Sequence, residues 1–133
     1  MKRRLVFKIL LVLYLIAVAW LCFGHFSSIP HVKMFYWGIP TDKIVHFLMF
    51  FPFPLLAFGA FDKYTTKPWH SFLFVAILFA IGCMLAGATE IGQSFTKYRS
   101  GDPKDFKADG LALGISCLIV LVIDLTRQLI KKR

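Results

Sequence analysis

Acidic residues and paired cysteines are scarce in this sequence. Its 133 residues include 7 Asp and Glu against 16 Lys and Arg, which gives a formal net charge of +9. The three cysteines, Cys22, Cys83 and Cys117, all lie in apolar runs, and no CxxC pair is present. An odd number of such cysteines predicts neither a disulfide framework nor a zinc site, because buried cysteine behaves mainly as a small apolar residue.

The sequence also lacks a basic stripe with interleaved aromatic residues on a soluble helix. A basic excess can indicate nucleic-acid binding, but here the Lys and Arg residues flank apolar runs. In that position they act as topology signals and as contacts to anionic lipid headgroups. We therefore predict membrane lipids as partners and no nucleic acid.

Apolar residues, in contrast, are in excess and fall into long runs. They make up 58% of the chain, against roughly 45–50% in soluble domains. The runs predict helices at about 5–23, 44–61, 70–89 and 109–127. About 20 residues of helix span the hydrocarbon core, and a helix satisfies its own backbone polar groups there. We predict an all-α membrane protein in which residues 1–133 form one domain, a four-transmembrane-helix bundle.

The first apolar run follows Lys2, Arg3 and Arg4, as the core of a signal peptide would. It exceeds the roughly 7–15 residues usual for such a core, and neither a small-x-small cleavage site nor a lipobox is present. We expect a retained helix.

Two further patterns concern the shape and packing of the helices. Pro52 and Pro54 lie inside the second run, and each removes a backbone donor, so a kink is expected there. Gly82 with Ala86, and Gly110 with Gly114, are spaced four apart. Such spacing either forms a close helix-packing seam or arises by chance among small residues.

Orientation follows from the Lys and Arg residues in the short flanks. With four crossings, ten of them fall on one side: Lys2, Arg3, Arg4, Lys8, Lys63, Lys67, Arg127, Lys131, Lys132 and Arg133. Six fall on the other side: Lys33, Lys43, Lys97, Arg99, Lys104 and Lys107. The richer side is predicted to be cytoplasmic, so both termini face the cytoplasm.

Most polar residues of chemical interest gather at the opposite, outer ends of the last three helices. They are Asp42, Lys43, His46, Glu90, Gln93, Arg99, Asp102, Asp105 and Asp109. Spacings of three or four place Asp42 with His46, and Glu90 with Gln93, on shared helix faces. Ionisable groups at the edge of a membrane segment are costly, usually paired, and candidates for function. We predict that they form one polar network.

Each of these residues also has a structural interpretation. Asp102 is a natural N-cap, and Pro103 suits the first helical position. Asp105 then stands where a carboxylate meets the positive end of the helix dipole. Either interpretation is open for a single residue, and the gathering of the whole set favours a site.

Three strings carry a resemblance to a known family: DKIVHF at 42–47, EIGQSF at 90–95 and RSGDPKDFKADGLALG at 99–114. In order and spacing they resemble the VanZ-like family, which has Asp-Lys-x-x-His at a helix start, Glu-x-x-Gln, and Arg followed by Asp-x-x-Ala-Asn before a last helix. The chain departs from that pattern at Asp109, where the family often has Asn, and at Ala112, where it often has Gly.

The resemblance implies a protein of the bacterial inner membrane and cell envelope. The namesake of the family is associated with resistance to the glycopeptide antibiotic teicoplanin. The leading hypothesis is that the outer polar cluster binds an amphipathic envelope ligand, such as a lipid-linked cell-wall precursor, a phospholipid head or a lipidated glycopeptide. Lys43, Lys97 and Arg99 would contact its anionic groups. No cofactor and no resident metal are predicted.

Two alternatives differ in class. In a membrane enzyme acting on a lipid-linked substrate, His46 with Glu90 or Asp105 would perform acid–base chemistry, or the carboxylates would hold a divalent metal. No Ser or Cys nucleophile motif accompanies them, so the sequence leaves catalysis open. A small multidrug transporter ranks last, because the acidic groups crowd one end and the first helix has no carboxylate.

Overall fold

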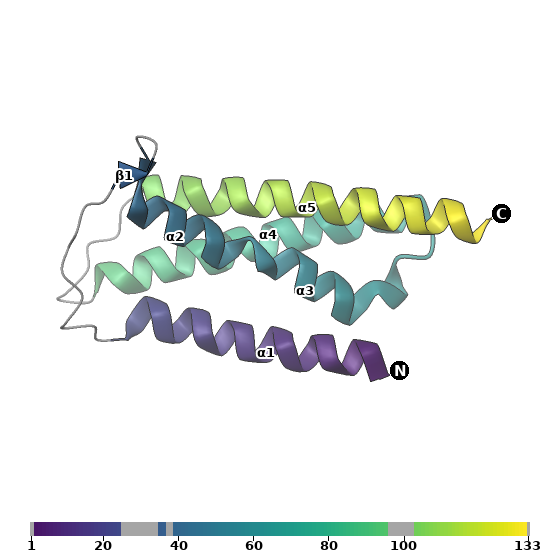
Figure 1. Ribbon diagram of the computed structural model, residues 1–133, viewed down its shortest axis with the longest axis horizontal. Coiled ribbons are helices and arrows are strands. Elements are labelled where there is room, and N and C mark those ends of the chain that lie inside the picture. Colours follow the sequence, from purple (N-terminus) through teal and green to yellow (C-terminus); the bar gives the residue numbers. More distant parts are fainter. Residues whose placement is uncertain (1, 25–34, 37–38, 96–102, 133) are drawn as a thin grey trace.

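The chain forms an elongated bundle of helices in the computed structural model (Figure 1). The structure describes residues 2–24, 35–36, 39–95 and 103–132, and the side chains of 2–24, 43–95 and 103–132. In chain order the elements are α1 (Lys2–Phe23), β1 (Phe35–Tyr36), β2 (Ile39–Pro40), α2 (Thr41–Phe50), α3 (Pro52–Phe61), the 3₁₀ turn η1 (Asp62–Tyr64), α4 (Pro68–Ser94) and α5 (Pro103–Lys131).

Four stretches of the described chain are long and apolar enough to cross a membrane. They are Lys2–Phe23, Lys43–Tyr64, Pro68–Ser94 and Pro103–Lys131. The prediction of an all-α, four-helix membrane bundle is therefore confirmed.

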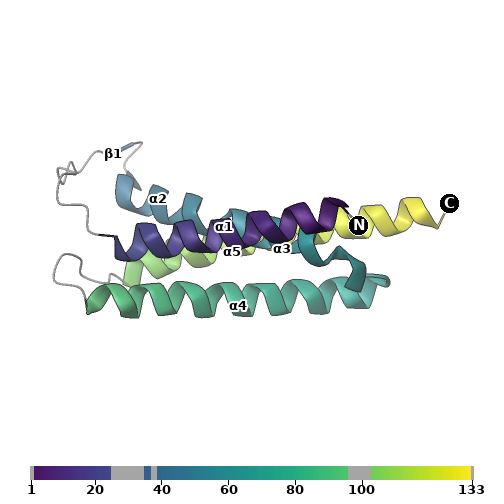
Figure 2. The same cartoon turned by 90° about the horizontal axis from the view of Figure 1, so that it is seen from below.

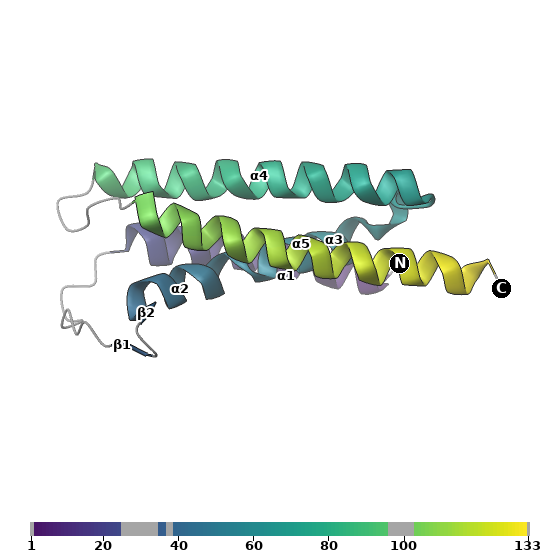
Figure 3. The same cartoon turned by 90° about the horizontal axis from the view of Figure 1, so that it is seen from above.

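The bundle has two distinct ends. α1 packs along α3, and α4 packs along α5; Figure 2 shows α4 as a separate layer below the other helices. The start of α1 and the end of α5 share one end, here called the terminal end, which also holds the turn after α3 (Figure 1). The short antiparallel hairpin β1–β2, the end of α4 and the start of α5 mark the opposite, loop end (Figure 3).

The helices extend beyond the apolar runs that predicted them. The fourth helix was expected over about 109–127, but α5 runs from Pro103 to Lys131, and α4 starts at Pro68. Proline suits the first helical turn because its fixed φ is helical and its missing N–H has no partner to lose. With 29 residues, α5 is about 43 Å long. It is therefore longer than the roughly 30 Å hydrocarbon core. The apolar run predicted only its middle part, because the residues at its two ends are polar.

The second span is broken at Phe51 into α2 and α3, as Pro52 and Pro54 predicted. A proline cannot donate to the carbonyl four residues earlier, so the hydrogen-bond ladder is interrupted there. Beside the break, the Tyr14 hydroxyl of α1 donates to the Met49 carbonyl at 2.5 Å. This hydrogen bond ties the first helix to the kink.

Of the two small-residue motifs, the one on α4 forms a close seam. A Cβ on Gly82 would stand 2.5 Å from Cδ2 of Leu113, and Ala86 is fully buried. Around Gly110, in contrast, no atom lies within 4 Å of such a Cβ. The α4–α5 seam thus depends on Gly82, and it fixes the distance between the two helices that carry most of the polar residues described next.

Candidate functional site: a buried histidine–carboxylate cluster

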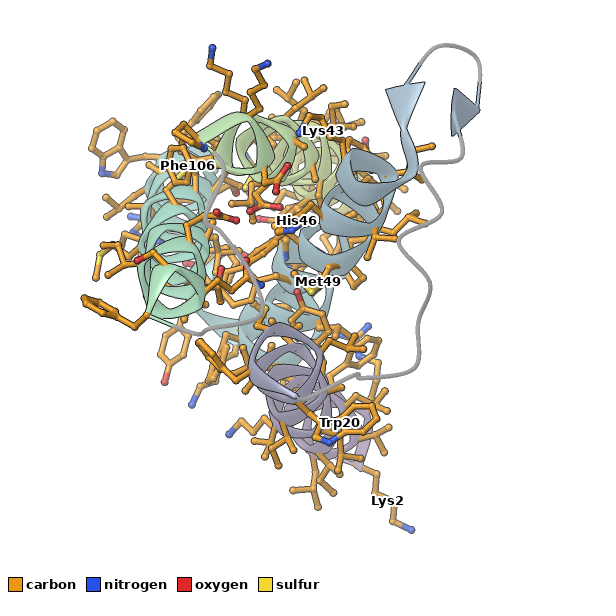
Figure 4. The ribbon with its side chains drawn as sticks, turned by 90° about the vertical axis from the view of Figure 1, so that its left-hand side faces the viewer. Lys2, Trp20, Lys43, His46, Met49 and Phe106 are labelled. Atoms are coloured by element: carbon orange, nitrogen blue, oxygen red, sulfur yellow. The ribbon has the colours of Figure 1, made fainter. Side chains whose placement is uncertain are left out.

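A group of buried polar side chains joins α2, α4 and α5 near the loop end. This His46 cluster consists of Lys43, His46, Glu90, Asp105 and Asp109. Only 4% of His46 and none of Asp109 is exposed. In Figure 4, which looks along the bundle from the loop end, His46 points from α2 into the space between the helices, toward carboxylate oxygens. The cluster is therefore interior to the bundle.

The imidazole of His46 stands between carboxylates at both of its nitrogens. Its Nδ1 lies 3.2 Å from Oδ1 of Asp109 and 3.7 Å from Oε1 of Glu90. Its Nε2 lies 3.7 Å from Oδ2 of Asp105. With the proton on Nδ1, the ring donates a hydrogen bond to Asp109.

Lysine completes the cluster through Asp105. Nζ of Lys43 lies 2.6 Å from Oδ1 of Asp105, so this carboxylate connects the ammonium to the imidazole. Lys43 and His46 are three apart on α2, and Asp105 and Asp109 are four apart on α5. Such spacings place each pair on one helix face, and the packing of α2 on α5 brings the two faces together.

Other residues of the predicted network lie elsewhere or outside the described part. Gln93 shares a helix with Glu90, but its Nε2 donates to the Cys22 carbonyl of α1 at 3.4 Å. The backbone of Asp42 begins α2, and its side chain lies outside the described residues. Arg99 and Asp102 also lie outside them. Of the six predicted residues whose side chains the structure describes, it thus joins five in this cluster.

The cluster has a geometry that a metal ion could use. One ligand atom each from His46, Glu90 and Asp109 lies within 4.8 Å of the others. Zinc binds nitrogen and oxygen at about 2.0–2.2 Å, so two ligands of one ion stand about 3–3.5 Å apart. Beyond them, Asp105 faces the second ring nitrogen of His46, and carboxylates commonly orient a ligating histidine in this way.

A second polar cluster, at the terminal end, was not predicted. This Asp62 cluster consists of Arg3, Arg4, Asp62, Asp124 and Arg127. Asp62 is 3% exposed, and its carboxylate accepts from Nε of Arg4 at 2.6 Å and from NH1 of Arg127 at 2.8 Å. Arg3 also donates to it. One carboxylate therefore holds together the ends of α1, α3 and α5.

Asp124 extends the second cluster toward α4. It is 1% exposed and accepts a hydrogen bond from the Ser71 hydroxyl at 2.6 Å, and its other oxygen lies 2.6 Å from NH2 of Arg127. Asp62 and Asp124 are carboxylates at the edge of apolar runs, as Glu90 is. The search for ionisable groups at the edges of membrane segments could therefore have found them. The sequence did not predict them, because the neighbouring arginines also fit topology signals and contacts to lipid headgroups.

Comparison of the chain with protein-family models, with curated proteins and with solved structures finds no match. The choice between the two clusters is therefore made on their chemistry. Histidine is the side chain suited to proton transfer and metal binding near neutral pH, whereas arginine forks are suited to fixed ion pairs. The His46 cluster is the candidate functional site.

Proposed function

We propose that the protein is a VanZ-like membrane protein of the bacterial cell envelope. Its His46 cluster binds the polar part of an amphipathic envelope ligand, such as a lipid-linked cell-wall precursor or a lipoglycopeptide of the teicoplanin type. The termini face the cytoplasm, and the loop end faces outward. The support is the convergence of five side chains from three helices: Lys43, His46, Glu90, Asp105 and Asp109. The first four match the family's quoted motifs, and Asp109 stands where the family often has Asn.

The cluster offers a cationic group and hydrogen-bonding groups, and such a ligand requires both. Lys43 supplies an ammonium that is partly exposed, with 22% of its side chain accessible. The carboxylates and the imidazole accept and donate hydrogen bonds to hydroxyl and amide groups. Apolar side chains next to the cluster, including exposed Leu48 and Val45 on α2, would contact the lipid part of the ligand.

Direct binding tests this proposal. Purified protein in lipid nanodiscs is titrated with teicoplanin and, separately, with a lipid-linked cell-wall precursor. We expect one of the two to bind, and His46→Gln to weaken that binding about tenfold, the loss expected for a charged or buried hydrogen bond. His70→Gln is the matched control, because His70 is a histidine at the terminal end that contacts Thr66. Equal affinities in both variants would contradict the proposal.

Orientation has its own test. The ten-to-six distribution of Lys and Arg predicts that the turn between α3 and α4 is cytoplasmic. A single reporter cysteine at Lys97, in a background without native cysteines, should react with a membrane-impermeant reagent in intact cells. One at Lys67 should be protected. The reverse pattern would show that the loop end faces the cytoplasm.

A second candidate, a membrane enzyme that uses a divalent cation, is favoured by one observation. Ligand atoms of His46, Glu90 and Asp109 gather within 4.8 Å, and such a set can bind Zn²⁺ or Mn²⁺. Metal analysis of protein purified without chelator distinguishes it from the first. Stoichiometric metal that is lost in Glu90→Gln and kept in His70→Gln supports the enzyme. Metal-free protein that still binds the ligand supports the first proposal.

A further inference from the structure

A basic pocket of about 350 Å³ opens at the terminal end of the bundle. Its lining carries five cationic side chains and one carboxylate: Arg4, Lys63, Arg127, Lys131, Lys132 and Asp62. Lys63, Lys131 and Lys132 are exposed. Asp62 and the neighbouring Asp124, which pairs with Arg127, cannot neutralise five cations, so the pocket has a net positive charge suited to a phosphate group.

The two arginines of this pocket are held in place before any ligand arrives. Asp62 accepts from Arg4 at 2.6 Å and from Arg127 at 2.8 Å. Arg127 also donates to the hydroxyl of Thr65 at 2.9 Å. Fixed guanidinium groups lose little conformational entropy when an anion binds. Asp62 therefore preorganises the pocket while leaving most of its charge available.

Gln128 gives the pocket a second kind of polar group. It lines the pocket and is 8% exposed. Its Nε2 donates to the hydroxyl of Ser71 at 2.7 Å, whereas its buried Oε1 accepts no hydrogen bond from the described residues. A buried acceptor without a donor is costly. A ligand hydroxyl, such as that of a glycerol headgroup, would satisfy it.

A shallow, open apolar groove along α5 adjoins the basic pocket, and all of its lining residues belong to that helix. It is lined by Val122, Ile123, Thr126 and Ile130, and it shares Arg127 and Lys131 with the basic pocket. Val122 and Ile130 are 63% and 69% exposed. A small soluble phosphate compound would use the pocket and leave the groove empty, whereas a lipid would use both.

We infer that this terminal-end surface is a binding site for an anionic glycerophospholipid. The phosphate lies among Arg4, Arg127 and the two lysines of α5, and one acyl chain lies in the groove. The site is separate from the His46 cluster and does not depend on the function proposed for that cluster. The bound lipid would contact Arg127, which belongs to both the pocket and the groove. Because Arg127 also pairs with Asp62, the lipid would link α5 to the neighbouring helices.

Competition binding in detergent micelles tests the headgroup part. The full-length protein is titrated with a fluorescent phosphatidylglycerol and competed with unlabelled phosphatidylglycerol or phosphatidylcholine. We expect a preference for the anionic lipid of about tenfold, which the double variant Lys131→Gln/Lys132→Gln abolishes, since each lysine near an anionic lipid contributes about a fivefold effect. The double variant Lys2→Gln/Lys67→Gln removes the same charge from the same end, outside the pocket, and should change affinity less than twofold.

The groove is tested with a bulky residue and a matched control one helical turn away. Val122→Trp fills the groove and should weaken phosphatidylglycerol binding at least about fivefold, whereas Leu118→Trp, on an equally exposed position outside it, should not. Both substitutions lie on the exposed face of α5, so folding is preserved, and a thermal melt of each variant verifies it. Glycerol phosphate and inorganic phosphate, which lack acyl chains, should not displace the lipid at millimolar concentration.

Three results would overturn the inference. Equal losses from the pocket and control lysine pairs would show general attraction to anionic lipid. Displacement by inorganic phosphate would show a soluble-anion site. Equal affinity for phosphatidylglycerol and phosphatidylcholine in the wild type would show that no anionic headgroup is recognised.

Discussion

The two ends of the bundle bury carboxylates in opposite ways. At the terminal end, Asp62 accepts from three arginines on two helices. At the loop end, Asp109 faces the ring of His46, and that ring also faces Glu90 and Asp105. The terminal end is built around guanidinium groups, and the loop end around an imidazole.

This difference leads us to propose a structural role for the Asp62 cluster and a chemical role for the His46 cluster. Guanidinium groups remain charged at all physiological pH values and make planar, directional hydrogen bonds, so the Asp62 cluster acts as a fixed lock between helix ends. An imidazole can gain or lose a proton and can bind a metal. Loss of a residue of the Asp62 cluster should therefore affect mainly folding, and loss of a residue of the His46 cluster mainly the proposed function.

The largest expected effect on stability is that of Asp62→Asn. Removing this charge leaves Arg4 without its carboxylate partner and leaves Arg127, whose side chain is 26% exposed, with Asp124 alone. We expect a loss of about 3 kcal/mol, typical when one partner of a buried ion pair is removed. Thermal unfolding in detergent measures it. An unchanged unfolding midpoint would show that the Asp62 cluster does not stabilise the helix ends.

A substitution at Gly82, midway along the bundle, should affect both stability and ligand binding. A valine at position 82 would meet Leu113, and overpacking of this kind costs about 1–3 kcal/mol. Gly82→Val should therefore lower both stability and ligand binding, because it separates α4 from α5. The control is Gly110→Ala, where the added methyl meets nothing within 4 Å. Alanine there should be neutral or stabilise by up to about 1 kcal/mol.

At the loop end, Asp109→Asn should cost function more than stability. The amide oxygen can still accept the hydrogen bond of His46, so we expect a loss of about 1 kcal/mol or less, the net value of one hydrogen bond. Ligand binding should fall, because the negative charge beside the imidazole is gone; wild-type binding would show that Asn, which the resembled family often has here, serves equally well. A stability loss as large as that of Asp62→Asn would show that both buried carboxylates contribute equally to folding, which contradicts the comparison.

The smallest expected effect is that of Arg3→Gln. Although Arg3 pairs with Asp62, its side chain is 65% exposed, and exposed ion pairs contribute about 0–1 kcal/mol. Arg127→Gln, whose side chain is far less exposed, should cost clearly more. Similar unfolding midpoints for the two variants would show that Arg127 stabilises the Asp62 cluster no more than Arg3 does.

The sequence predicted the bundle because lipid requires uninterrupted apolar helices, and Pro52 and Pro54 predicted the break between α2 and α3. It predicted candidate polar residues through costly charges at helix ends. It could not predict that Glu90 and Gln93, three apart on α4, serve different partners. Nor could it pair Asp62 with Arg4 and Arg127, because contacts across 58 and 65 residues depend on tertiary packing.

The same limit explains the unpredicted lock. A positive flank fits both a topology signal and an ion-pair network, and only the packing of α1, α3 and α5 around Asp62 distinguishes them. The sequence offered a divalent metal as an alternative, but it could not show which ligand atoms would meet, because His46, Glu90 and Asp109 come from three separate helices.

The central claim is that the His46 cluster carries the proposed ligand-binding function, whereas the Asp62 cluster at the terminal end carries stability. The most direct measurement is function per folded molecule in Glu90→Gln, a substitution that keeps the shape of the side chain and removes its charge. Lipoglycopeptide susceptibility of cells is measured together with the amount of folded protein in their membranes, with Asp62→Asn as the reference. The account predicts that Glu90→Gln abolishes the phenotype at wild-type abundance, whereas Asp62→Asn lowers phenotype and abundance together. A wild-type phenotype in Glu90→Gln, or a loss in strict proportion to its abundance, would contradict the account.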